Sequence, residues 1–82
     1  MNQHDWLERI QLNPKIMVGK PVIKGTRIPV DLLVRMVAQG VSEAEILEEY
    51  PRLELADIRA ALSYAAMLVA QDEIFPLQLQ PL

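Results

Sequence analysis

The stretch GVSEAEILEEYP, residues 40–51, decides the fold of this chain. Ser42, followed three residues later by Glu45, is a capping box, in which each side chain accepts a hydrogen bond from a backbone N–H at the start of a helix. A short helix therefore begins at Ser42. Pro51 ends it, because proline disfavours helical geometry at the residue before it. Its inward side chains are expected to be Ile46, Leu47 and Tyr50.

Two longer helices flank this stretch. Residues 30–39 carry apolar side chains at helical spacing, and Gly40 is placed to end that helix in a left-handed conformation. After the turn that follows Pro51, a third helix begins near Glu54 and runs through Ala70. Its expected inward stripe is Leu55, Ile58, Leu62, Ala65 and Val69.

The residues before these helices predict an extended segment. Arg9 to Asn13 alternate in polarity, with Ile10 and Leu12 on the same side, as in a short half-buried strand. Residues 19–29 contain too many glycines and prolines for a helix. We expect a few residues around Arg27 to pair with the Ile10 strand.

The expected fold class is mainly α. Residues 30–72 form a three-helix body, residues 1–29 a short β or extended arm, and residues 73–82 an apolar tail, all within a single domain. A short helix, a tight turn with proline and a longer helix form the outline of a helix-turn-helix unit. Many three-helix bundles that bind no DNA share this outline.

The residue inventory argues against catalysis. The chain has no cysteine, one histidine (His4) and two serines, of which Ser42 already caps a helix. These residues cannot form a catalytic triad of a nucleophile, a general base and a residue that orients the base. We expect no enzyme activity, cofactor, metal site or small-molecule substrate. No apolar run approaches the roughly 20 residues that a membrane span requires, and the N-terminus does not resemble a signal peptide. A cytoplasmic location is expected.

Charge is divided unevenly along the chain. Residues 1–40 carry a net charge of +3 and residues 41–82 a net charge of −6. A polyanion would therefore meet the first half. Arg27 has two interpretations, a phosphate contact or a partly buried salt bridge that holds the arm against an acidic helix. The candidate DNA-binding residues are Lys15, Lys20, Lys24, Arg27, Arg52 and Arg59.

Apolar surface exceeds what so small a core can bury. Hydrophobic residues make up 51% of the 82 residues, and residues 60–70 are apolar on every face except for two hydroxyls. A second copy of the chain, or another protein, is expected to cover this helix. The tail alternates apolar and polar residues, which suits a segment bound in a groove or, alternatively, a frayed terminus. The candidate partner-binding residues are Tyr64, Met67, Leu68, Ile74, Phe75, Leu77 and Leu79.

The ordered string GKPVIKGTRIPV, residues 19–30, resembles the "domain of unknown function 433" family, and the likeness covers about residues 9–70. The resemblance implies a winged or homeodomain-like helical fold and a role as a VapB-like antitoxin. Such an antitoxin would form a homodimer, inhibit a PIN-like ribonuclease toxin and repress its own operon by binding operator DNA. Where the family often has Thr or Ser to cap the third helix, this chain has Glu54. The alternative to an antitoxin is a protein-interaction module that never binds DNA, which the acidic pI of 5.0 and the acids of the third helix favour.

Overall fold

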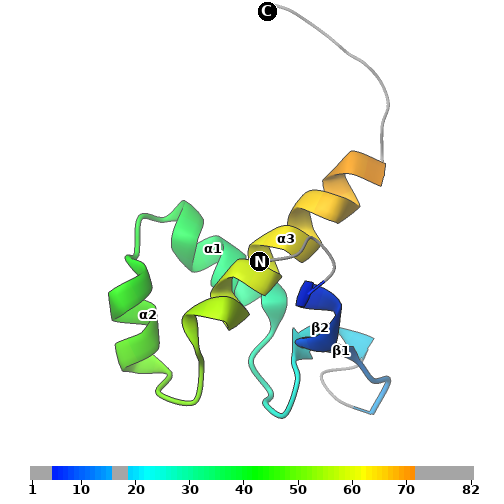
Figure 1. Ribbon diagram of the computed structural model, residues 1–82, viewed down its shortest axis with the longest axis horizontal. Coiled ribbons are helices and arrows are strands. Elements are labelled where there is room, and N and C mark those ends of the chain that lie inside the picture. Colours follow the sequence, from blue (N-terminus) through cyan, green and yellow to red (C-terminus); the bar gives the residue numbers. More distant parts are fainter. Residues whose placement is uncertain (1–4, 16–18, 72–82) are drawn as a thin grey trace, which may run out of the picture.

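The computed structural model describes residues 5–15 and 19–71 (Figure 1). This part of the chain is mainly helical, with three α-helices and a short antiparallel sheet of two strands near the N-terminus. In chain order the elements are the 3₁₀-helix η1 (Asp5–Glu8), β1 (Ile10–Leu12), β2 (Pro21–Ile23), α1 (Val30–Ala38), α2 (Glu43–Glu49) and α3 (Leu55–Gln71). Within these residues, no helix is both long and apolar enough to cross a membrane.

The core lies where the three helices meet the sheet. Leu33 of α1, Ile46 of α2 and Ile58 of α3 are fully buried, and Ile23 of β2 joins the same cluster. Burying a side chain of this size contributes about 1.5–3 kcal/mol. The arm expected from the sequence is therefore part of the hydrophobic core.

The helix boundaries expected from the sequence are confirmed. The Ser42 Oγ accepts from the Glu45 backbone N–H at 3.1 Å, and the Glu45 carboxylate accepts from the Ser42 N–H at 3.0 Å. Gly40 follows α1 with φ +89°, the left-handed conformation that glycine adopts without steric cost. These signals could be predicted because each depends on residues only a few positions apart.

The expected pairing of residues around Arg27 with the Ile10 strand is wrong. The partner of β1 is β2, with Ile10 opposite Ile23 and Leu12 opposite Pro21. After β2 the chain turns sharply at Gly25, whose φ is +81°, and returns so that Val22 bridges to Pro29. The Thr26 hydroxyl donates to the Ile23 carbonyl at 2.7 Å and accepts from the Ile28 N–H, which fixes the turn. Arg27 therefore lies in the connecting turn, outside the strand pair.

Two expectations about burial also need correction. On α3, Leu55 is 36% exposed and Val69 is 74% exposed, so the inward stripe does not extend to either end of the helix. The buried alanines Ala60 and Ala61 allow close packing on two sides of α3 instead. Leu12 is 61% exposed, because β1 lies at the edge of a sheet too small to cover it.

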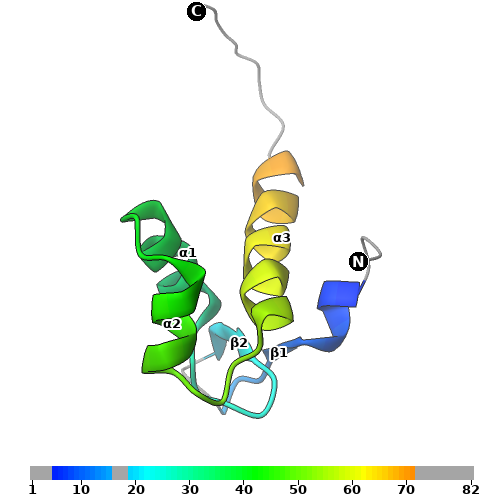
Figure 2. The same ribbon diagram turned by 60° about the vertical axis from the view of Figure 1, so that its left-hand side comes forward.

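The helix η1 was not foreseen. It places Trp6 against α3, where the Trp6 ring meets the Tyr64 ring edge to face with centroids 5.6 Å apart. Trp6 is 9% exposed, so the indole covers one side of α3 while α1 covers another. The C-terminal turns of α3 extend past both neighbours, as two views of the molecule agree (Figures 1 and 2).

Candidate functional site

Arg9 joins the N-terminal segment to the start of α3. Its guanidinium donates to the Asp57 carboxylate at 3.0 Å and to the Glu54 carboxylate at 3.1 Å. The hydrogen bond to Asp57, and after it the hydrogen bond to Glu54, raises the pKa of the Arg9 guanidinium above its ordinary value. Arg9 is therefore positively charged at neutral pH.

Asp57 also caps α3. Its second carboxylate oxygen accepts from the Glu54 backbone N–H at 2.8 Å, which is one half of a capping box. Asp57 is 7% exposed, and its charge also favours the positive end of the helix dipole. Asp57 therefore satisfies the backbone N–H of Glu54, the residue that stands where the family often has Thr or Ser. Because Arg9 pairs with both acids, the first turn of α3 repels an approaching polyanion less than its sequence implies.

A shallow pocket of about 380 Å³ lies beside this cluster, where the turn after β2 meets the turn before α3. The Arg52 Nη2 donates to the Gly25 carbonyl at 3.0 Å and joins the two turns. Among the described residues, no carboxylate lines the pocket. Its lining residues are Gln11, Gly25, Thr26, Arg27 and Arg52.

The structure divides the other candidate DNA-binding residues among several places. Lys20 pairs with Asp31 at 3.4 Å, at the start of α1. Lys24 lines a separate polar pocket together with Glu8, Arg9 and Asp57. Lys15 and Arg59 are exposed. Of the six cations, the structure thus brings only Arg27 and Arg52 together in one pocket.

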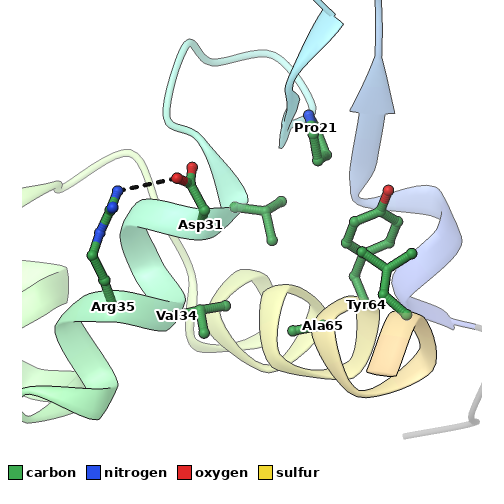
Figure 3. Close-up of a pocket in the computed structure, with 8 residues that line it drawn as sticks. Pro21, Asp31, Val34, Arg35, Tyr64 and Ala65 are labelled. Atoms are coloured by element: carbon green, nitrogen blue, oxygen red, sulfur yellow. Dashed lines mark hydrogen bonds and ion pairs between the residues drawn. The ribbon is translucent and has the colours of Figure 1, made fainter. Parts of the chain in front are cut away.

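An apolar groove of about 300 Å³ runs between α1 and α3 (Figure 3). Tyr64 and Leu68 line it from α3, Val34 lines it from α1, and Pro21 lies at one end. Asp31 and Arg35, paired at 3.0 Å, form its polar rim. Tyr64 is half-buried and Leu68 is 45% exposed, so the groove presents apolar surface to solvent.

The remaining partner candidates have different positions. Met67 is half-buried on α3 and does not line the groove. Four candidates lie outside the described residues: Ile74, Phe75, Leu77 and Leu79.

Sequence reasoning missed two features of these sites. Arg9 was not singled out, and the salt bridge to an acidic helix that was considered for Arg27 is made by Arg9. The two partners are 48 positions apart in the sequence, so no local pattern marks the pair. The contribution of α1 to the groove was also missed, because its apolar residues were assigned to the core. Among the described residues, no group of three or more His, Asp or Glu side chains could hold a metal ion.

Comparison with known proteins gives relatives whose function is not described. An uncharacterized protein of Sinorhizobium fredii, y4eO, is 41% identical over 58 residues, which cover 71% of this chain and 26% of that protein. An uncharacterized protein of Archaeoglobus fulgidus is 67% identical over 30 residues, which cover 37% of this chain and 83% of that protein. This chain thus spans about a quarter of the Sinorhizobium relative.

The fold has a counterpart in a crystal structure at 2.00 Å of a DUF433 member from Anabaena variabilis. The two share 38% sequence identity with a TM-score of 0.71, over 77% of this chain and 62% of that chain. The family described as "Protein of unknown function (DUF433)" matches residues 10–65, which confirms the resemblance of the glycine- and proline-rich string. The chain belongs to the DUF433 family.

Proposed function

We propose that this chain is a non-catalytic, antitoxin-like module of a type II toxin–antitoxin pair. It binds and inhibits a PIN-like ribonuclease toxin through apolar surface, and it represses its own operon by binding DNA. The observation that carries the DNA half is the pocket at the turns beside the N-terminus of α3, which Arg27 and Arg52 line and to which no described residue contributes a carboxylate. The toxin assignment rests on the family resemblance.

The DNA-binding half uses α2, the turn at Pro51 and α3 as a helix-turn-helix, with α3 as the recognition helix. Arg59 and Leu55 are exposed on the first turns of α3, where base edges would be reached. Arg52 precedes the helix and Arg27 lies across the pocket from the same end. In Figures 1 and 2, both turns lie at the end of the molecule opposite the last turn of α3. DNA and a protein partner can therefore bind at the same time.

The protein-binding half uses the groove and the exposed end of α3. Leu68 and Val69 are adjacent on this helix and expose 45% and 74% of their surface. Apolar area of this kind is the common feature of partner-binding surfaces on small proteins. A second copy of the chain would bury part of it, and a dimer would present two DNA-binding ends, which offsets the few cations of each copy.

The DNA half is tested by a gel-shift titration on the duplex upstream of the gene, at several salt concentrations. We expect retardation that weakens steeply as salt rises, because protein–phosphate contacts release counterions from DNA. An unrelated duplex of equal length serves as the control. Absence of retardation at low salt, or retardation that does not respond to salt, contradicts the DNA half.

The second candidate function, a protein-interaction module that does not bind DNA, is favoured by the apolar groove between α1 and α3. Co-purification with the product of the neighbouring gene discriminates between the two. A stable complex without any DNA shift favours the second candidate, whereas a complex together with a salt-dependent shift favours the antitoxin. Leu68→Ser should weaken the complex in either case, and Leu12→Ser, which changes an exposed leucine that does not line the groove, is its matched control.

A further inference from the structure

Four of the five arginines of this protein occur in two kinds of surroundings. Arg9 and Arg35 each lie within 3.0 Å of a carboxylate oxygen. In the described part of the chain, neither Arg27 nor Arg52 makes an ion pair, although both line the same pocket. Two guanidinium groups that share a pocket repel each other unless an anion lies between them. The two positive charges of this pocket therefore favour the binding of an anion.

The backbone positions Arg52 without neutralising it. One of the five N–H donors of its guanidinium is used by the Gly25 carbonyl, at 3.0 Å. That bond holds the side chain across the two turns and leaves the other donors available. Arg27 is exposed on the same turn as Gly25, and the Gln11 side chain adds a polar group from β1. The result is an open site with two guanidinium groups, which suits a tetrahedral oxyanion.

We propose that this pocket, lined by Arg27 and Arg52, binds one backbone phosphate of duplex DNA. The inference rests on the proposed function and adds that the turn after β2, which lies outside the helix-turn-helix, fixes the position of α3 on DNA. Duplex DNA fits better than a small free anion, because an open pocket encloses a free ion poorly whereas the rest of the interface holds a DNA phosphate in place. Gly25 has no side chain, and a Cβ built there would meet nothing within 4 Å, so a phosphate ridge can approach the turn.

The test compares three variants of the full chain in the gel-shift titration. Arg27→Gln removes one charge and, since the structure gives Arg27 no bond within the described residues, leaves the turn intact. Gln39→Glu lowers the net charge by the same one unit at the exposed residue that ends α1, outside the pocket and the groove, and is the matched control. Arg52→Lys keeps the positive charge but loses the paired N–H donors of the guanidinium. For Arg27→Gln we expect about an eightfold loss of affinity at roughly 0.1 M salt, similar for every duplex sequence, and a log–log salt slope shallower by about 0.9.

The control should lose less than about twofold, because it lowers the net charge without removing a phosphate contact. Arg52→Lys should fall between the two, since a lysine gives a point charge in place of two parallel donors. If wild-type protein shifts DNA and Arg27→Gln behaves like Gln39→Glu, the pocket assignment is overturned while the proposed function stands.

Titration of inorganic phosphate into the ¹⁵N-labelled chain gives a second measurement. We expect amide shifts at Gly25, Thr26 and Arg52 that Arg27→Gln weakens. If these shifts occur but no duplex is retarded, the DNA assignment is overturned, and with it the DNA half of the proposed function, while an anion site remains. If neither the shifts nor the retardation occur, both are overturned.

Discussion

Arg9 lies at the start of α3, and the pocket that Arg27 and Arg52 line lies beside it. The guanidinium groups of these two places have different partners. Arg9 has two carboxylates within 3.1 Å, and one of them, Asp57, is buried and caps a helix. Arg27 and Arg52 line a pocket that has no carboxylate from the described residues. The first arrangement stabilises the fold, because charge-assisted hydrogen bonds to a buried group are the strong ones. The second contributes nothing comparable to the fold, so its benefit is expected in binding. Four substitutions, each measured as the free energy of unfolding in urea at pH 7, test this difference.

Asp57→Ala should have the largest effect, a loss of about 2–3 kcal/mol. The change removes a helix cap and leaves the Arg9 guanidinium with only the exposed Glu54. Asp57→Asn should lose less, because its amide oxygen still accepts from the Glu54 N–H. Equal losses for the two variants would mean that the charge of Asp57, and not the cap, provides the stability.

Arg9→Met should cost roughly 1–1.5 kcal/mol, because the Arg9 side chain is 36% exposed and water screens part of the interaction. The raised pKa of Arg9 sets the pH dependence. A cation whose pKa is raised in the folded state stabilises it at every pH below its ordinary pKa, and loses this contribution only as the pH rises through the folded pKa. The cost of Arg9→Met should therefore be the same at pH 7 and pH 9. A cost that shrinks between these values contradicts this origin.

Arg35→Gln should cost no more than about 0.5 kcal/mol. Its partner Asp31 is four residues earlier on α1, and both side chains are about half exposed or more. The cost should disappear when the measurement is repeated in high salt, which screens surface charges. A loss that persists in salt would show that the rim of the groove stabilises the fold in some other way.

Arg27→Gln should have the smallest effect, within about 0.2 kcal/mol of zero, because surface changes away from stabilising contacts are nearly neutral. Any change at low salt should be a gain, since the substitution separates two like charges. A clear loss of stability would mean that Arg27 stabilises the turn, and the contrast between the two arginine sites would fail.

The helix ends show where sequence reasoning succeeds. The Ser42 box, the stop at Gly40 and the third helix all follow from residues within one or two turns of each other, and the structure confirms them. The resemblance to the DUF433 family was equally visible, because it rests on one continuous string of residues.

Part of the candidate site was visible in the same way. Arg27 and Arg52 were both chosen as DNA-binding candidates because each is a cation in a segment expected to approach DNA, the glycine- and proline-rich arm for Arg27 and the start of the third helix for Arg52. That they share a pocket depends on the hydrogen bond between Arg52 and Gly25, which are 27 positions apart. Lys20 was chosen for the same reason, and the fold places it beside Asp31. Residue type therefore identified the cations, while folding determined which of them have a carboxylate partner.

The sequence by itself determined the helices and their ends, because capping and glycine stops act through neighbouring residues whose geometry the chain fixes locally. Only the tertiary structure decided that β1 pairs with Pro21–Ile23, that Trp6 covers α3 and that Val69 is exposed. It also joined Arg9 to Asp57 and placed Arg27 and Arg52 in a pocket that no acid of the described segments lines. These outcomes depend on contacts between distant segments, whose strength is set by the burial and the charge of the folded molecule as a whole.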